Sequence, residues 1–129
     1  MTEPVWLDVE EVLAINDRQI GEFGGSLGLR DRGLLESALG KPLNGFAYGK
    51  PSLAELAASY AFGISKNHPF VDGNKRVGFA SSCVFLKLNG HRLIATEAEA
   101  TLKMLALAAG KLTEKQLAKW IAINLEKSK

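Results

Sequence analysis

The chain has 129 residues, 47% of them hydrophobic and 23% charged, which is the size and composition of one ordinary globular domain over residues 1–129. Its formal net charge of +2, with Lys and Arg scattered along the chain, gives no reason to expect direct nucleic-acid binding, and no apolar run approaches the ~20 residues that cross a bilayer. A single cysteine, Cys83, excludes an internal disulfide, and the acidic first residues lack a signal-peptide pattern, so we expect a cytoplasmic protein that does not bind membranes.

The first half of the chain predicts three helices and one hairpin. Helical patterns begin at Asp8 and at Ser52, each with a capping box. In a capping box the first side-chain oxygen accepts a hydrogen bond from a free backbone N–H, and a Glu three residues later bonds back to the backbone N–H of the capping residue. A shorter helix is expected from about Asp31 to Gly40, since the glycine and the following Pro42 favour termination. The stretch 43–48 looks extended, and its Asn44-Gly45 pair is a strong signal for a hairpin turn.

The second half predicts three more helices. One should run from about Asn74 to Asn89, and because residues 77–86 carry no charge, it should be the buried centre of the fold. After a short extended stretch at 91–94, capping boxes at Thr96 and Thr113 begin two further helices, the last carrying apolar residues as far as Leu125. The sequence therefore predicts an all-α bundle of about six helices with one small β-hairpin.

The run HPFVDGNKR, residues 68–76, joins two of the predicted core helices. Pro69 disfavours α geometry at His68, so the run should form a loop that leads into the N-terminus of the buried helix. Free backbone N–H groups at such an N-terminus suit a phosphate, and Gly73 allows its close approach. Lys75 and Arg76 place two cations where the helix macrodipole favours acids, which makes sense if a bound anion pairs with both.

The other polar residues of this run suit phosphoryl or nucleotidyl transfer to a protein hydroxyl. Asp72 offers an oxygen ligand for Mg²⁺, His68 can act as a general base near neutral pH, and Asn74 can donate its amide to a phosphate oxygen. A P-loop is excluded, because Phe79-Ala80 stands where that motif requires Lys-Ser or Lys-Thr. On these residues alone, a polar connecting loop stays as open as an active site.

HPFVDGNKR resembles the signature of the Fic/Doc (Fido) family, specifically its death-on-curing, Doc-type toxin branch. The resemblance extends to LRDRGLLESAL at 29–39, AASYAFGISKN at 57–67 and FLKLNG at 85–90, and so covers most of the chain. It implies a compact helical bundle in which a flap hairpin aligns the target segment, with residues 43–48 as the candidate. It also implies site roles: His68 activates the target hydroxyl, Asp72 holds Mg²⁺, Gly73 and Asn74 form part of the phosphate-binding nest, and Arg76 pairs with phosphate. Lys75 and Arg76 thus count, with His68 and Asp72, among the expected catalytic residues and, with Gly73 and Asn74, among the expected nucleotide-binding residues.

One departure from the AMP-transferring Fic enzymes bears on which group the protein would transfer. Those enzymes typically read HPFxxGNGR with a second Arg three residues later, whereas here Lys75 replaces the glycine and Phe79 stands in place of that Arg. The Lys form is similar to Doc-type toxins, in which the nucleotide binds reversed and the γ-phosphate of ATP is transferred to elongation factor Tu. The resemblance therefore implies an Mg-ATP-dependent protein kinase that arrests translation, with AMP transfer or a non-catalytic binding module as alternatives.

The resemblance also implies a protein partner. Many Fic proteins carry an inhibitory helix with Ser/Thr-x-x-x-Glu followed by Gly or Asn, but no Glu of this chain precedes Gly or Asn. We therefore expect a separate antitoxin in trans, a partly disordered protein that folds onto the toxin.

Overall fold

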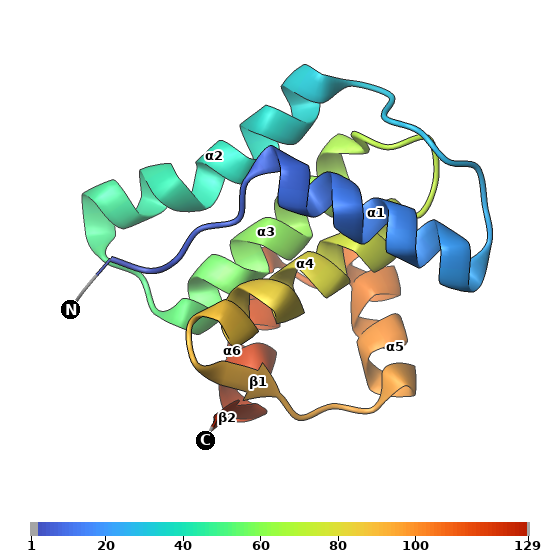
Figure 1. Ribbon diagram of the computed structural model, residues 1–129. Helices are drawn as coiled ribbons and strands as arrows, with labels where there is room; N and C mark the ends of the chain where they lie inside the picture. Colours follow the sequence, from blue (N-terminus) through green and yellow to red (C-terminus); the bar gives the residue numbers. More distant parts are fainter. Residues whose placement is uncertain (1–2, 129) are drawn as a thin grey trace.

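Six helices and one two-stranded sheet make up the computed structural model, which describes residues 3–128 (Figure 1). This confirms the predicted all-α fold with a small β element. None of the helices within that range is both long and apolar enough to cross a membrane. In chain order the elements are α1 (Val9–Phe23), α2 (Arg32–Gly49), α3 (Leu53–Asn67), α4 (Asn74–Leu88), β1 (His91–Leu93), α5 (Glu97–Ala108), α6 (Glu114–Ile123) and β2 (Leu125–Lys127).

The helices begin where the sequence predicts. All four expected capping boxes form, with N-caps at Asp8, Ser52, Thr96 and Thr113, and each satisfies backbone N–H groups that the first helical turn leaves free. Asp31 caps α2 without a capping box: its side chain accepts a hydrogen bond from the Leu34 N–H.

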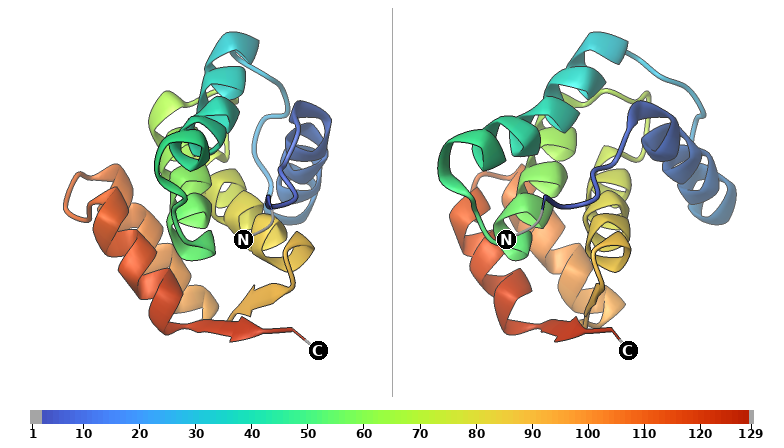
Figure 2. Two further views of the ribbon diagram at one scale, coloured as in Figure 1. Left: turned by 90° about the vertical axis from the view of Figure 1, so that its left-hand side faces the viewer. Right: turned by 60° about the vertical axis from the view of Figure 1, so that its left-hand side comes forward.

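Helices α3 and α4 form the centre of the fold, with α1 and α2 on one side and α5 and α6 on the other (Figure 2). No residue from 77 to 86 is exposed, which confirms α4 as the buried helix. Tyr60 and Phe85 are fully buried with ring centroids 5.0 Å apart. The two helices approach closely at Gly78, where a Cβ atom would lie 2.9 Å from the Ala61 carbonyl oxygen.

The predicted end of the second helix and the hairpin after it are wrong. Helix α2 continues past Gly40 and contains Pro42, so the segment 43–48 is helical and cannot be a flap hairpin. Burial explains the continuation: Leu39, Pro42 and Phe46 recur at helical spacing on the inner side of α2, and Phe46 packs edge-on against Trp6 at 5.5 Å. Asn44-Gly45 lies on the exposed side, where nothing enforces a turn.

The small sheet lies at the other end of the sequence. β1 falls where the sequence predicts extended chain, and it pairs antiparallel with β2, with Leu93 opposite Leu125. The last helix ends at Ile123, so Leu125 belongs to this strand and not to the helix as predicted. Leu93 of β1 and Leu125 of β2 are half-buried, and both side chains pack against the edge of the core.

Candidate active site

The loop of residues 68–73, which we call the motif loop, begins where α3 ends. His68 follows the last residue of α3 and has φ 50° and ψ 54°, a left-handed conformation that is uncommon for any residue but glycine. The guanidinium of Arg30 holds this turn: its Nε donates to the His68 carbonyl oxygen at 2.7 Å and its Nη2 to the Asn67 carbonyl oxygen at 3.0 Å. Arg30 therefore satisfies carbonyls that the helix end leaves free.

A second segment, residues 24–31, runs alongside the motif loop. The backbone N–H groups of Arg30 and Asp31 both donate to the Pro69 carbonyl oxygen, and the Val71 N–H donates to the Gly28 carbonyl oxygen at 3.0 Å. Phe70, only 1% exposed, anchors the motif loop in the core beside this segment. The loop is therefore fixed by backbone pairing on one side and by an aromatic anchor beneath.

Asp72 is exposed, yet its carboxylate is oriented by two backbone donors. Its Oδ1 accepts from the Gly73 N–H at 2.9 Å and its Oδ2 from the Ser26 N–H at 3.2 Å. Gly25 permits this approach, because a Cβ atom there would lie 2.7 Å from Asp72 Oδ2 and its φ of +115° disfavours other residues. This pairing could not be predicted from the sequence, since Ser26 and Asp72 are 46 residues apart.

Asn74, the first residue of α4, is 6% exposed, and its side chain is bound inside the motif loop. Its Oδ1 accepts from the Phe70 N–H, and its Nδ2 donates to the Phe70 carbonyl oxygen, both at 3.0 Å. The same Nδ2 lies 3.3 Å from Nδ1 of His68. The side-chain amide predicted to reach a phosphate is thus engaged within the loop.

Within residues 3–128, α4 differs from the other five helices because no side chain caps its N-terminus. Gly73 occupies the cap position with φ 76°, so the first N–H groups of α4 are left for an external acceptor. Lys75 and Arg76 are exposed in this first turn, and neither pairs with a carboxylate in the described part of the chain. Arg76 rests 5.0 Å over the ring of Phe23.

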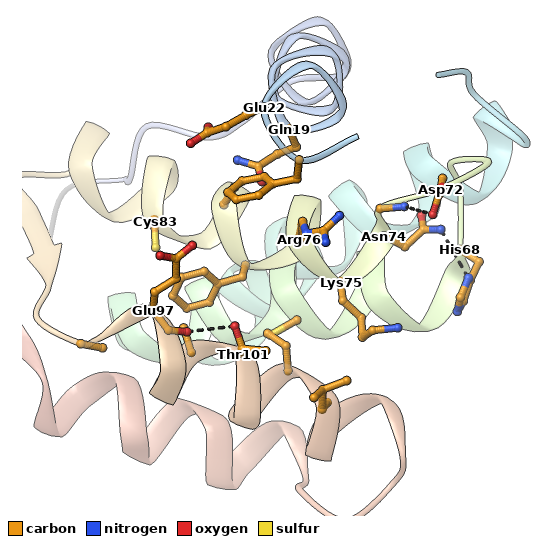
Figure 3. A pocket seen from close by; sticks show the side chains of 18 of the residues that line it. Gln19, Glu22, His68, Asp72, Asn74, Lys75, Arg76, Cys83, Glu97 and Thr101 are labelled. Carbon is orange, nitrogen blue, oxygen red and sulfur yellow. Dashed lines mark hydrogen bonds between the residues drawn. The ribbon is translucent and has the colours of Figure 1, made fainter. Parts of the chain in front are cut away.

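A cleft of about 920 Å³ opens at this helix end (Figure 3). Arg76 points toward α1, whereas Lys75 points toward the side of α5. The structure brings together at the cleft all six residues that the sequence singles out, although their chemical roles stay predictions: His68, Asp72, Gly73, Asn74, Lys75 and Arg76.

Two further helices and the continuation of α4 line the cleft, and of their residues sequence reasoning singled out only Phe79 for its bearing on the site. Helix α1 contributes Gln19, Glu22 and Phe23, and the start of α5 contributes a wall that runs from Ala95 to Leu105. Along α4, the wall beyond Arg76 is apolar, formed by Phe79, Ala80 and the partly buried Cys83. Burial raises the pKa of the Cys83 thiol to about 11, so this part of the cleft carries no thiolate at neutral pH. Only tertiary packing brings α1 and α5 to the motif.

Comparison with known proteins decides the family. A model of the Fic/DOC family matches residues 6–86, which is more than half of the chain. This chain belongs to the Fic/DOC family. A protein named Toxin Doc from Mycolicibacterium smegmatis is 41% identical over 98 residues, covering 74% of this chain and 71% of that protein. A protein named Protein kinase doc from Escherichia phage P1 is 35% identical over 82 residues, covering 63% of this chain and 65% of that protein.

The residues that match the Fic/DOC model include the polar end of the cleft. Residues 6–86 contain α1, the segment 24–31, the motif loop and most of α4, and so include every group that orients Asp72 and His68. The wall supplied by α5 lies beyond the match.

Proposed function

We propose that this Fic/DOC protein is a toxin kinase that transfers the γ-phosphate of Mg-ATP to a hydroxyl of a translation factor, elongation factor Tu, and so arrests translation. The single observation that carries the proposal is the uncapped N-terminus of α4, which opens into the cleft beside Lys75 and Arg76, two cations with no carboxylate partner within residues 3–128. The printed names of the two relatives, one a toxin and one a protein kinase, agree with it.

The phosphates of the nucleotide are bound at the start of α4. Free N–H groups, the helix macrodipole and the side chains of Lys75 and Arg76 all favour negative charge there. Transfer needs little covalent chemistry from the protein beyond positioning and charge stabilisation, which these groups supply. His68, exposed at the other edge of the motif loop, accepts the proton of the attacking hydroxyl.

Asp72 suits a magnesium ion that is held mainly by phosphates. Among residues 3–128, no three His, Cys, Asp or Glu side chains converge on one position, so a site built wholly from protein ligands is not available there. Mg²⁺ usually takes one or two carboxylates together with phosphate oxygens and water. The two backbone hydrogen bonds fix the carboxylate of Asp72 and still leave lone pairs on its oxygens. When bound, the ion would neutralise charge on the phosphates.

The apolar wall after Arg76 favours γ-phosphate transfer over AMP transfer. Phe79 lines the cleft one turn along α4, at the position where AMP-transferring relatives carry a second arginine. A phenyl ring offers no hydrogen bond to a further phosphate, so the polar contacts are concentrated between Asp72 and Arg76. One well-bound phosphate at the helix N-terminus, next to His68, is the arrangement that the kinase reaction requires.

A separate antitoxin in trans restrains the toxin. The chain has no Ser/Thr-x-x-x-Glu helix followed by Gly or Asn that could block its own site. A toxin named as such among the relatives is consistent with a partner encoded outside this chain.

Labelled ATP tests the proposal. Purified protein is incubated with Mg²⁺ and either γ-labelled or α-labelled ATP, on purified elongation factor Tu and on whole lysate. We expect label only from the γ position, reduced by roughly 10²–10⁴-fold in the His68→Ala variant, the usual cost of losing a general base. Label from the α position alone would favour AMP transfer. Growth arrest that survives His68→Ala unchanged would indicate a non-catalytic binding module.

A further inference from the structure

Two neutral backbone donors orient the carboxylate of Asp72. Its Oδ1 accepts from the Gly73 N–H at 2.9 Å and its Oδ2 from the Ser26 N–H at 3.2 Å. Within residues 3–128 no Lys, Arg or His forms an ion pair with it, although Lys75 and Arg76 follow in the first turn of α4. Backbone donors fix the direction of a carboxylate without cancelling its charge, so Asp72 stays available to a cation.

One of these donors comes from outside the motif loop. Ser26 belongs to the segment 24–31, which is fixed beside the loop by the bond from the Val71 N–H to the Gly28 carbonyl oxygen at 3.0 Å and by an isolated β-bridge. Since backbone bonds hold both segments, the Ser26 N–H has a defined position relative to the carboxylate. Outer contacts of this kind orient the carboxylates that bind metals.

Gly25 makes this contact sterically possible. A Cβ atom there would lie 2.7 Å from Oδ2 of Asp72 and 3.2 Å from Cδ1 of Ile20, so a side chain at this position would displace the carboxylate or the α1 side chain. Its φ of +115° is also one that residues with a side chain rarely adopt. Gly24 has a positive φ too, +84°, but nothing lies within 4 Å of an added Cβ. The two neighbouring glycines therefore separate backbone strain from contact with Asp72.

We propose that Gly25 is a positioning residue for the magnesium ion: it lets the Ser26 N–H hold Asp72 in one orientation and so sets the affinity for the ion. The inference rests on the proposed function, because the ion is the one that accompanies the nucleotide. Mg²⁺ demands nearly ideal ligand geometry and takes few carboxylates, so a displaced Asp72 lowers its affinity. The segment 24–31 thereby acts on the metal from 46 residues before the motif carboxylate.

The first test measures nucleotide binding with and without the metal. ATP is titrated calorimetrically into the full chain, without a target protein, once in Mg²⁺ and once in EDTA. We expect Gly25→Ala to weaken binding in Mg²⁺ by roughly 10–100-fold, toward the EDTA value, which is the usual cost of a lost outer contact at a metal site. The dissociation constant in EDTA should not change. Gly24→Ala, strained in the same turn, is the matched control and should bind like the wild type in both buffers.

The two glycine variants give distinct outcomes. Magnesium-dependent affinity that persists in Gly25→Ala would overturn the positioning role and leave the proposed function intact. Equal weakening in Gly24→Ala would also overturn it, because strain alone would then be the cause. A wild type whose ATP affinity does not respond to Mg²⁺ would count against the proposed function, and the positioning role would fall with it.

Hydrogen exchange tests the contact itself, without nucleotide, metal or a glycine variant. Ser26 is exposed, so its amide proton should exchange slowly with water only if Asp72 accepts it. We expect a protected Ser26 amide in the wild type, measured by NMR, and loss of this protection in Asp72→Ala. The Val71 amide, bonded to Gly28, should stay protected in both proteins. An unprotected Ser26 amide in the wild type, or protection that survives in Asp72→Ala, would overturn the proposal.

Discussion

At the scale of single residues, the site depends on groups outside its own motif. Arg30 bonds two carbonyls at the end of α3, and Ser26 and Gly25 shape the surroundings of Asp72. Sequence reasoning assigned none of these three residues a site role, because each acts on a distant segment: Arg30 on the carbonyls of residues 67 and 68, and Ser26 and Gly25 on the carboxylate of Asp72. The motif residues themselves could be predicted, since their chemistry is unusual for the first turn of a helix.

Replacing Arg30 with Lys should loosen the motif loop. A lysine has one ammonium group and cannot reproduce the two-pronged geometry of the guanidinium, so at least one carbonyl loses its partner. We expect a loss of about 1 kcal/mol in the free energy of unfolding, measured with urea, together with slower phosphate transfer. Arg18→Lys, exposed on α1, is the control. Equal stability and rate for Arg30→Lys and the wild type would show that Arg30 does not hold the loop.

Cys83 should make the protein less stable in alkali. Burial raises the pKa of its thiol to about 11, above the ordinary value of 9.0 that applies to the unfolded chain. Between about pH 9 and 11 the unfolded state releases a proton that the folded state retains, so stability is complete below pH 9 and falls as the pH rises through this window. The pKa of Tyr60, raised to about 12 by burial, adds a similar loss between about pH 10 and 12.

The Cys83→Ala variant separates the two contributions. The wild type should lose about 1–3 kcal/mol more of its free energy of unfolding from pH 8 to pH 11 than the variant, since about 1.4 kcal/mol corresponds to each unit of pKa shift. Urea unfolding at both pH values gives the difference. An identical pH dependence in the two proteins would contradict the raised pKa of Cys83.

At the scale of elements, helix starts could be predicted and one helix end could not. Capping boxes are local, so four of them could be identified from residues three apart. Helix α2 continues through Pro42 and Asn44-Gly45 because its inner side packs against Trp6 and the core, and tertiary burial outweighs the local preference for a turn. β2 could not be predicted either, since its partner strand lies 32 or more residues earlier.

Gly45 distinguishes a helix from a hairpin at this place. In the helix, an alanine at this position has room, because nothing lies within 4 Å of an added Cβ, and it loses less backbone entropy than glycine. Gly45→Ala should therefore raise the free energy of unfolding by about 0.5–1 kcal/mol. Gly90→Ala, also in open space but at φ +81°, should lower it. Destabilisation by Gly45→Ala would instead favour the hairpin turn.

At the scale of the whole molecule, the cleft forms between helices that are far apart in the sequence. The motif supplies only its polar end, while α1 and α5 close it from positions more than 40 residues before and about 20 residues after the motif. The sequence predicts the phosphate end because that end is one continuous run of nine residues. It could not predict Glu22, Glu97 or Thr101, which are ordinary surface residues of amphipathic helices until the fold brings them together.

The central claim, that the start of α4 holds the γ-phosphate beside His68 for transfer, is tested most directly by the mass of the modified target. Elongation factor Tu is incubated with the protein, Mg²⁺ and ATP, and its intact mass is measured by mass spectrometry, with the His68→Ala protein in parallel. We predict a gain of one phosphoryl group with the wild type and none with His68→Ala. A gain of one AMP group, or a phosphoryl gain that persists in His68→Ala, would contradict the account.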